Sequence, residues 1–431
     1  MKMIITPQTL GGTIQVPSSK SIGHRELICA ALAPEQSYVE NISPSQDIDA
    51  TCGILRSLGA TIEEIQSRLP GRTAYKIQGS LQQTGQRITA DCCESGSTLR
   101  FLIPVGLIGR NIVTFTGQGR LADRPLEPYF DLFREQGIAF QQGTEGKSLP
   151  LTVQGTLRPG TYTLPGNVSS QFFTGLLLAL PLLDGDSVLI STTPLESVSY
   201  VTMTIACMAN HGVHVYSDSK GTFRIPGNQQ YRAGRYVIEG DYSQAAFWLS
   251  AGLLSKTAIV CTGLRPRSSQ GDMAIVSILR AMGGELSSGG ATLTAHPSVL
   301  TGRTIDVEDC PDLVPALAVV ASCSKGTTHI VHAARVRFKE CDRLHAMAVE
   351  LNKLGADIHE EPEGLLIHGV PALHGGIVSA WNDHRIAMAL AIATQRCHDT
   401  VTIEGAESVR KSYPEFWKDF AEMGGICKQE G

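Results

Sequence analysis

A sixfold repeat is the feature of this 431-residue sequence that most restricts its fold. A short amphipathic helical pattern ending in glycine recurs along the chain, and successive glycines are about 69 to 78 residues apart. The closing glycines are Gly59, Gly137, Gly212, Gly283, Gly355 and Gly424. Glycine readily adopts the left-handed conformation that ends many helices, and a short extended segment follows each of these positions. We therefore expect six copies of one structural unit.

A second, more apolar helix alternates with the amphipathic one. Each apolar run follows a serine or aspartate that can cap a helix N-terminus. These starts lie near Ser21, Ser95, Ser169, Asp241, Asp312 and Asp383. Because helices that are apolar all round lie inside a domain, each unit is predicted to hold one buried and one half-exposed helix with strands between them.

The order of the units predicts two domains. The first three apolar helices fall within residues 19–236, and the last three fall within 237–431. The sixth unit is short of strand residues, whereas the segments at 3–6 and 13–16 precede the first helix and have a strand-like pattern. We therefore expect residues 1–18 to join 237–431 in the second domain, with two chain crossings.

The composition excludes several classes of protein. A net charge of -5 argues against nonspecific binding of nucleic acid. The longest apolar stretch, 172–183, is shorter than the roughly 20 residues of a membrane helix, and residues 1–12 lack the apolar core of a secretion signal. Eleven cysteines without zinc-like spacing are interpreted as reduced thiols, which favours a cytoplasmic protein.

Cations are concentrated at the helix starts and in a few loops. Six short windows together hold twelve Lys or Arg and five acidic residues, a charge of about +7, so about -12 remains elsewhere. These windows are 19–25, 94–100, 119–125, 335–343, 383–385 and 409–412. Helix N-termini also attract anions. The pattern favours a site for a small anionic ligand, although simple helix capping also explains any single serine or aspartate.

The segment 335–343 leaves two conformations open. In an extended backbone, Arg335, Arg337 and Lys339 would lie on one face and would need an anionic partner. In a helix, Lys339 would share a face with Arg343, and Glu340 could pair with Arg343. Either conformation places several cations close together.

Taken together, these windows resemble the 5-enolpyruvylshikimate-3-phosphate synthase family, also called 3-phosphoshikimate 1-carboxyvinyltransferases. The resemblance runs almost end to end. It rests on PSSKSIGHR (17–25), ESGSTLR (94–100), DRP (123–125), VSSQ (168–171), EGD (239–241), PD (311–312), RFKECDR (337–343), NDHR (382–385) and KSYP (411–414). The implied fold is the inside-out α/β barrel of the enolpyruvyl transferases: two similar domains of three βαβαββ units, with buried helix N-termini facing an interdomain cleft.

The resemblance also implies an activity. Members of the family transfer the enolpyruvyl group of phosphoenolpyruvate to the 5-hydroxyl of shikimate 3-phosphate and release phosphate, a step towards chorismate and the aromatic amino acids. It implies no metal, no organic cofactor, no nucleic acid or membrane partner, and a monomer in the cytoplasm.

Residue roles are carried over by matching position. The expected shikimate 3-phosphate contacts are Lys20, Ser21, Arg25, Ser169, Ser170, Gln171, Ser197, Tyr200, Asp312 and Lys339. The expected phosphoenolpyruvate contacts are Lys20, Gly96, Arg124, Gln171, Arg343, Arg385 and Lys411. The expected catalytic groups are Asp312 as base for the 5-hydroxyl, Lys20 and Glu340 for proton transfer at the methylene carbon, and His384 in support.

Two alternatives have the same fold. The related transferase that acts on UDP-N-acetylglucosamine usually carries a cysteine in the loop before its Arg-Pro motif. Here the loop Gly117–Arg124 has none, and Ser169, Ser170 and Ser197 match the shikimate-phosphate ligands. A non-catalytic anion-binding scaffold is the other alternative. The presence of Lys20, Asp312, Glu340 and His384 argues against it.

Overall fold

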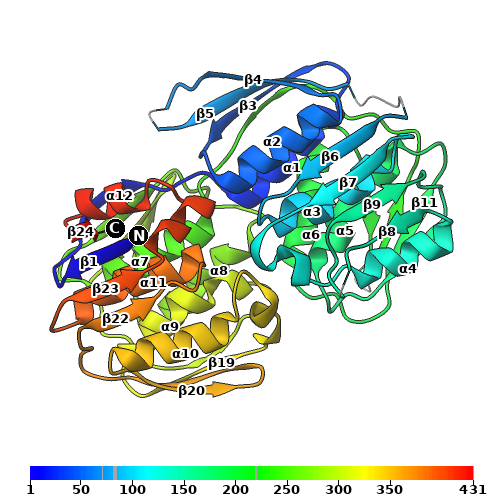
Figure 1. Ribbon diagram of the computed structural model, residues 1–431. Helices are drawn as coiled ribbons and strands as arrows, with labels where there is room; N and C mark the ends of the chain where they lie inside the picture. Colours follow the sequence, from blue (N-terminus) through cyan, green and yellow to red (C-terminus); the bar gives the residue numbers. More distant parts are fainter. Residues whose placement is uncertain (70, 81–84, 145, 219–220, 431) are drawn as a thin grey trace. The chain divides into compact units, whose positions relative to one another are not determined.

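The computed structural model describes residues 1–69, 71–80, 85–144, 146–218 and 221–430, in two compact units. Unit 1 comprises Met1–Ser19 and Glu239–Gly431, and unit 2 comprises Lys20–Ile238 (Figure 1). The ranges expected from the repeat, 1–18 with 237–431 and 19–236, differ from these by one or two residues at each crossing.

Each unit contains three four-stranded sheets of one design. Two neighbouring strands are parallel, and two antiparallel strands complete the sheet on one side; these two form a hairpin in every sheet but the sixth, where they are β1 and β24. In the second, third, fifth and sixth sheets a buried helix links the two parallel strands, whereas in the first and fourth sheets the parallel partner, β14 or β2, comes from elsewhere in the chain. A second helix follows in each repeat, and the order of elements along a repeat is βαβαββ. This is the fold class expected from the sixfold repeat.

Unit 2 contains the first three sheets. The first consists of β14 (Arg235–Val237), β3 (Gln36–Ile42), β5 (Thr73–Gln78) and β4 (Thr61–Gln66), with helices α1 (Lys20–Leu32) and α2 (Gln46–Ser57). The second consists of β6 (Arg87–Asp91), β7 (Ile112–Thr116), β9 (Leu151–Gln154) and β8 (Ala139–Gln141), with α3 (Gly96–Gly106), the 3-10 turn η1 (Gly119–Asp123) and α4 (Glu127–Gln136). The third consists of β10 (Thr161–Leu164), β11 (Ser187–Ser191), β13 (Thr222–Ile225) and β12 (Tyr216–Ser217), with α5 (Ser170–Ala179), η2 (Leu180–Leu182) and α6 (Val198–Asn210).

Unit 1 contains the other three sheets. The fourth consists of β2 (Gly12–Gln15), β15 (Ile259–Thr262), β17 (Thr292–His296) and β16 (Glu285–Gly289), with α7 (Tyr242–Leu254), η3 (Gly271–Met273) and α8 (Ala274–Ala281). The fifth consists of β18 (Thr304–Asp306), β19 (Thr327–Val331), β21 (Gly364–His368) and β20 (Asp357–Glu361), with η4 (Pro311–Leu313), α9 (Val314–Ser322), η5 (Ala334–Phe338) and α10 (Arg343–Lys353). The sixth consists of β22 (Gly376–Ser379), β23 (Val401–Glu404), β1 (Lys2–Thr6) and β24 (Ile426–Glu430), with α11 (His384–Ala393), η6 (Thr394–Arg396), η7 (Ala406–Lys411) and α12 (Phe416–Glu422).

Strands from outside the repeats complete three of the sheets. β1 lies between β23 and β24 in the sixth sheet, and the two marked chain ends therefore lie close together (Figure 1). β2 pairs in parallel with β15 in the fourth sheet. In unit 2, β14 closes the first sheet in parallel with β3. The N-terminal strands thus supply two sheets of unit 1, not the sixth alone.

The cores follow the predicted division of the helices. All residues of α7, α9 and α11 are buried, and nearly all of α1, α3 and α5 are buried. In each unit, these apolar helices belong to one continuous hydrophobic cluster. The amphipathic helices bury one face, and all six closing glycines have a positive φ, as expected. All eleven cysteines are free thiols.

Two of the six predicted helix starts differ in the structure. α1 begins at Lys20, so Ser21 lies in its first turn instead of capping it. Asp312 lies in η4 and α9 begins only at Val314, with Leu313 at its cap position. Pro311 and Pro315 suit a tight first turn without a side-chain cap, so the carboxylate of Asp312 makes other contacts instead of capping the helix. Ser95, Ser169, Asp241 and Asp383 are N-caps as predicted.

No helix in the described ranges is both long enough and apolar enough to cross a membrane.

Candidate active site

Most of the residues expected to bind ligand lie at or next to a helix N-terminus. Lys20, Ser21 and Arg25 lie on α1; Gly96 begins α3; Arg124 follows η1; Ser169, Ser170 and Gln171 form the start of α5; and Ser197 and Tyr200 lie at the start of α6. In unit 1, Asp312 lies in η4, Lys339 and Glu340 follow η5, Arg343 begins α10, His384 and Arg385 begin α11, and Lys411 ends η7.

Asp312 is the centre of a charged cluster in unit 1. Arg343 Nη1 donates to its Oδ1 at 2.8 Å, and Arg385 Nη2 donates to its Oδ2 at 3.0 Å. The Nζ of Lys339 lies 3.5 Å from the same carboxylate. Burial raises the pKa of Asp312, but Arg385, Lys339 and Arg343 outweigh it and hold this pKa well below its usual range. Asp312 is therefore a stable carboxylate in this state.

Arg343 is shared among three acids. Its Nε donates to Asp383 Oδ2 at 2.8 Å, and its Nη2 donates to Glu340 Oε2 at 2.8 Å, in addition to the bond to Asp312. The side chain is 1 % exposed. Burial lowers its pKa, but Asp383, Glu340 and Asp312 raise it well above the usual value. One guanidinium therefore links the starts of α9, α10 and α11.

The segment before α10 adopts neither of the two conformations considered from the sequence. Ala334–Phe338 forms the 3-10 turn η5, after which Lys339 is extended. Arg337 Nη1 pairs with Asp342 at 2.8 Å and Glu360 at 2.6 Å, so it is bound by acids of the protein. The pair between Glu340 and Arg343 forms as expected, because Arg343 begins the helix.

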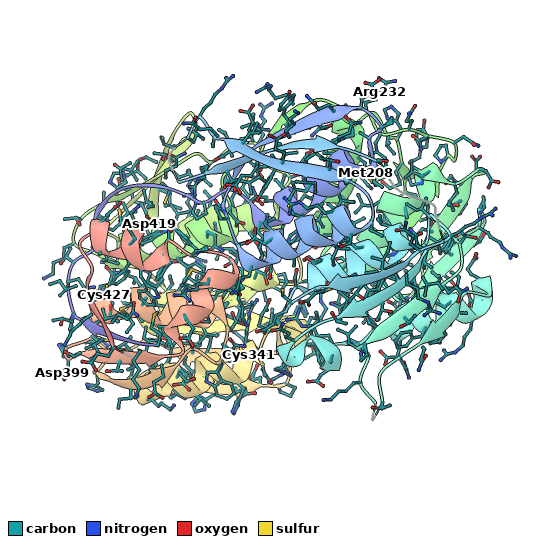
Figure 2. The ribbon with its side chains drawn as sticks, turned by 45° about the horizontal axis from the view of Figure 1, so that its top comes forward. Met208, Arg232, Cys341, Asp399, Asp419 and Cys427 are labelled. Carbon is teal, nitrogen blue, oxygen red and sulfur yellow. The ribbon has the colours of Figure 1, made fainter. Side chains whose placement is uncertain are left out.

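The turn before α11 is held on several sides. Trp381 and Asn382 both have a φ of 52°, and Lys411 Nζ donates to the Asn382 carbonyl at 2.7 Å. Asp383 caps α11 by accepting from the Arg385 amide at 2.8 Å, and the thiol of Cys341, labelled in Figure 2, lies 3.6 Å from its Oδ2. His384 is buried, with Nδ1 3.9 Å from Asp383 Oδ1. Lys411, His384 and Arg385 are thereby gathered at one helix start.

Arg25 in unit 2 has neutral partners. Its guanidinium donates to the hydroxyl of Thr204 at 2.8 Å and to the carbonyls of Ser21 at 2.8 Å and Tyr200 at 3.1 Å. It lies 4.9 Å from the ring centre of Phe101. Among the residues of unit 2 that the structure describes, none forms an ion pair with Arg25. Burial accordingly lowers its pKa to about 10.

A second group in unit 2 surrounds Gly96. Arg100 Nη1 donates to Gln171 Oε1 at 2.7 Å, and Gln171 Nε2 donates to Ser97 Oγ at 3.0 Å. A Cβ on Gly96 would lie 2.5 Å from Arg124 Nη1, so a larger residue here would require the guanidinium of Arg124 to move. Burial, followed by the charge of Arg124, lowers the pKa of Arg100 to about 9. The group concentrates two cations beside the start of α3.

The remaining predicted residues of unit 2 lie at polar helix starts. Lys20 Nζ pairs with Asp47 Oδ2 at 2.6 Å. Ser169 caps α5 by accepting from the Gln171 amide at 3.3 Å, and Ser170 is buried beside it. Ser197 is buried with a left-handed φ of 52° at the start of α6. Tyr200 contributes its carbonyl to Arg25.

Sequence reasoning did not assign roles to several partners of these residues. Asp47 and Asp383 were not placed in the site, although they hold Lys20 and Arg343. The sequence places Arg100 among the concentrated cations but indicates no ligand for it. Asp47 lies 27 residues from Lys20, and Asp383 lies 40 residues from Arg343, so no local pattern could pair them. Only the cap position of Asp383 was visible in the sequence.

A family model described as EPSP synthase (3-phosphoshikimate 1-carboxyvinyltransferase) matches residues 4–420. The chain belongs to this family. It is 51% identical to the 3-phosphoshikimate 1-carboxyvinyltransferase of Clostridium acetobutylicum over 421 residues, which is 98% of this chain and 97% of the relative. It is 44% identical to that of Clostridioides difficile, again over 98% and 97% of the two chains.

Solved structures agree on the EPSP synthase fold. The EPSP synthase of Acinetobacter baumannii has a TM-score of 0.83 at 24% identity, covering 99% of this chain and 100% of that one. The enolpyruvyl transferase NikO of Streptomyces tendae has a TM-score of 0.79 at 18% identity, covering 99% and 98%. The family, the fold class and the shikimate-pathway transferase activity predicted from the sequence are confirmed.

Proposed function

We propose that the clusters around Asp312, Arg25 and Gly96 are the machinery with which this EPSP synthase transfers the enolpyruvyl group of phosphoenolpyruvate to the 5-hydroxyl of shikimate 3-phosphate. The observation that carries the assignment is the Asp312 cluster, in which one carboxylate contacts two guanidinium groups and an ammonium group. Cations at a helix start are suited to binding a ligand with two anionic groups, a carboxylate and a phosphate. A carboxylate among these cations is suited to proton transfer.

Shikimate 3-phosphate is assigned mainly to unit 2. Hydroxyls and helix amides at the starts of α5 and α6, with the cations of α1, are suited to its phosphate and ring hydroxyls. The assigned residues are Lys20, Ser21, Arg25, Ser169, Ser170, Gln171, Ser197 and Tyr200, with Asp312 and Lys339 of unit 1. Arg25 supports this assignment, because an anion beside it would offset the cost of burying its charge without an ion pair.

Phosphoenolpyruvate is assigned to polar groups in each of the two units. Its carboxylate and phosphate suit the planar forks of arginine. The assigned residues are Lys20, Gly96, Arg124 and Gln171 of unit 2 and Arg343, Arg385 and Lys411 of unit 1.

The reaction needs three proton movements. Protonation of the methylene carbon makes C2 electrophilic, and the 5-hydroxyl oxygen bonds to C2 as its proton leaves. The C2–O bond to phosphate then breaks, and one proton leaves the methyl group to restore the double bond. We assign the hydroxyl proton to Asp312, the delivered proton to the Lys20 ammonium and the final proton to the Glu340 carboxylate, with His384 in a supporting position.

The charges around Asp312 connect binding to this chemistry. Arg343 and Arg385 hold Asp312 as a weak base in the structure described here. When the ligand's anionic groups draw on the same guanidinium groups, less positive charge remains for Asp312, and its pKa rises towards the ordinary range. A carboxylate with a higher pKa is a better proton acceptor. Asp312 therefore becomes an effective base only after phosphoenolpyruvate has bound.

The test is phosphate release from phosphoenolpyruvate with two acceptors supplied separately. Shikimate 3-phosphate should support turnover, whereas UDP-N-acetylglucosamine should not. Phosphate release only when the nucleotide sugar is the acceptor would contradict the assignment.

We further propose that the enzyme acts in the cytoplasm as a monomer and without a cofactor. Turnover after exhaustive treatment with a chelator tests the absence of a metal cofactor, and the mass measured by light scattering tests the monomer.

A further inference from the structure

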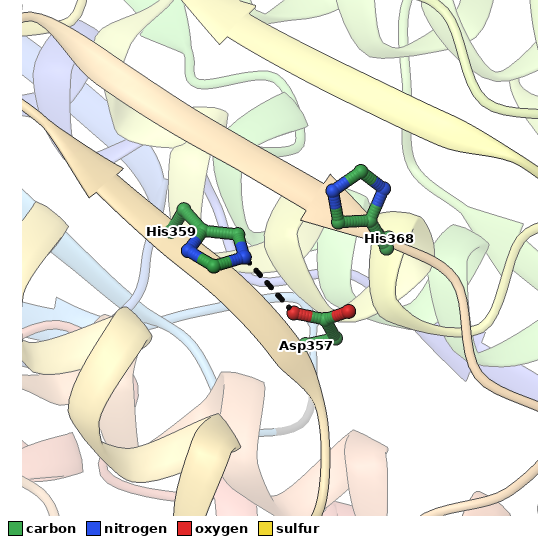
Figure 3. Close-up of side chains that lie close together, drawn as sticks. All are labelled: Asp357, His359 and His368. Atoms are coloured by element: carbon green, nitrogen blue, oxygen red, sulfur yellow. Dashed lines mark ion pairs between the residues drawn. The ribbon is translucent and has the colours of Figure 1, made fainter.

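The outer face of the fifth sheet carries three side chains that have no part in the proposed reaction. Asp357 and His359 lie on β20, and His368 lies on the neighbouring strand β21. Side chains alternate along a strand, and the buried Ile358 and Ile367 occupy the inner face. The three polar side chains therefore share the outer face, where Figure 3 shows them gathered.

Strand register brings the three groups together. Asp357 pairs directly with His368 across the antiparallel hairpin, and His359 follows Asp357 by two residues on the same face. His359 Nε2 lies 3.2 Å from Asp357 Oδ1, and one ligand atom from each of the three residues lies within 4.8 Å of the others. Ligand atoms of a tetrahedral zinc ion with bonds of 2.0–2.1 Å are about 3.3 Å apart, so small rotations of these side chains reach that geometry.

A second contact orients one of the imidazoles. The hydroxyl of Thr327, on β19, is 2.9 Å from Nδ1 of His368. When Nδ1–H donates to this hydroxyl, the lone pair lies on Nε2, the form that binds a metal. Metal-binding histidines commonly have such a partner on the second nitrogen. The hydrogen bond restricts the ring of His368 before any ion arrives.

The charges around Asp357 are compatible with a bound cation. Of the ion pairs formed by described residues, Asp357 has one, and its partner is His359, which is itself a metal ligand in its neutral form. A metal ion bound to both groups would take the place of the contact between them. We propose that Asp357, His359 and His368 form a binding site for a divalent cation of the zinc type, which fastens β20 to β21.

The ligand set indicates the class of metal. Two imidazoles and one carboxylate suit Zn²⁺, Co²⁺, Ni²⁺ or Cu²⁺, whereas Mg²⁺ and Ca²⁺ prefer oxygen ligands. Three protein ligands leave at least one coordination position for water. Because a metal ion binds the neutral form of an imidazole, affinity for the ion falls in acid.

A second group of similar composition provides an internal comparison. Asp306, Glu308 and His332 also lie close together, but this group has one imidazole and two carboxylates. Arg335 donates to the Glu308 carbonyl at 2.9 Å, so a guanidinium lies beside the group. That positive charge disfavours a metal ion, and we expect the two-histidine group to bind Zn²⁺ more tightly.

Calorimetric titration of the metal-free, full-length enzyme with Zn²⁺ tests the proposal. Zn²⁺ affinity should fall at least tenfold in His359→Ala and in His368→Ala. The matched control is His329→Ala, because His329 is an imidazole on the adjacent strand β19 that pairs with Glu361. Equal Zn²⁺ affinity in the wild type and in both site variants would overturn the proposal, as would an equal loss in the control.

The position of the ion can be measured independently. Crystals grown with Zn²⁺ should show an anomalous peak about 2.0–2.2 Å from Asp357 and both imidazoles. A peak only at other residues, or none, would overturn the site. Turnover should equal the wild-type value in His359→Ala and His368→Ala, because neither residue is assigned to the transferase reaction; failure of the metal site would therefore leave the proposed function intact.

Discussion

The two units bury arginine in opposite ways. In unit 1, Arg343 contacts the carboxylates of Asp312, Glu340 and Asp383, and these acids raise its pKa well above the usual value. In unit 2, Arg25 and Arg100 contact hydroxyl, amide and carbonyl groups and aromatic rings, and burial lowers their pKa to about 10 and about 9. Among the described residues, the buried arginine of unit 1 is thus neutralised by carboxylates, whereas those of unit 2 contact neutral groups.

This difference separates two kinds of anion binding. A ligand at Arg25 or Arg100 supplies a charge that the protein lacks, so its binding relieves the cost of burial. A ligand at Arg343 and Arg385 must share guanidinium groups that already hold Asp312. Under the proposed assignment, binding in unit 1 would therefore change the state of Asp312, whereas binding in unit 2 would mainly add affinity.

The largest expected effect follows from removing the carboxylate at the centre of the unit 1 cluster. Asp312→Asn should lower kcat by about 10²–10⁴-fold, because the 5-hydroxyl loses its base. The KM for phosphoenolpyruvate should stay the same or fall, because Arg343 and Arg385 no longer share their charge with a carboxylate. Steady-state phosphate release measures both constants, with Asp306→Asn as control because Asp306 pairs with the exposed His332. Near-normal kcat would remove Asp312 from this role.

Arginine removal in the two units sharpens the comparison. Arg343→Met should destabilise the protein by about 3–5 kcal/mol, because it leaves buried acids without their cation. Arg100→Met should cost less, about 1–3 kcal/mol, since it breaks hydrogen bonds but also removes a buried charge without a carboxylate partner. Urea unfolding of both variants measures the difference. Equal losses would show that the acids around Arg343 do not distinguish the units.

The raised pKa of Asp272, in unit 1, predicts that the stability of the protein depends on pH. Burial, together with the nearby charge of Asp312, raises the pKa of Asp272 to about 6. Between about pH 4 and pH 6 the folded state keeps a proton that the unfolded state has lost, so this group's contribution to stability declines as pH rises. Once the pH is above about 6, roughly 2–3 kcal/mol of stability has been lost relative to pH 4. Thermal unfolding across this range should show a shallower decline for Asp272→Asn; parallel curves would contradict the raised pKa.

The smallest expected effect concerns the close approach in unit 2. Gly96→Ala places a Cβ 2.5 Å from Arg124 Nη1, so this cation must move. The KM for phosphoenolpyruvate should rise about tenfold, equivalent to about 1.4 kcal/mol, with a smaller change in kcat. Gly53→Ala is the matched control, because no atom lies within 4 Å of a Cβ at this helical position. An unchanged KM in Gly96→Ala would argue against ligand binding beside Gly96.

The fold was predictable because its signals are local and repeated. Glycines such as Gly137 and caps such as Ser95 and Asp383 act within a few residues, and six copies reinforce one another. The capping role of Asp312 was predicted wrongly, since the two prolines around it favour a tight turn that leaves its side chain for Arg343 and Arg385. The sequence alone does not distinguish an aspartate that caps a helix from one that pairs with a cation.

The pairings within the candidate site were not predictable in the same way. The contacts from Lys20 to Asp47 and from Arg343 to Asp383 join separate repeats or separate helices, and they depend on how the buried helices pack. The low pKa of Asp312 follows from those pairings, so it was not visible in the sequence either. Residue types and helix starts were readable, whereas the charge balance required the structure.

The threading of β1 between β23 and β24 has a consequence for synthesis on the ribosome. Unit 2 is complete once Ile238 has emerged, so it can fold while the rest is still being translated. The sixth sheet instead pairs Lys2 with Glu430, so β1 completes its pairing only after β24 has been made. A nascent chain therefore carries an unpaired apolar strand until β23 and β24 emerge, which makes premature termination more harmful to unit 1 than to unit 2.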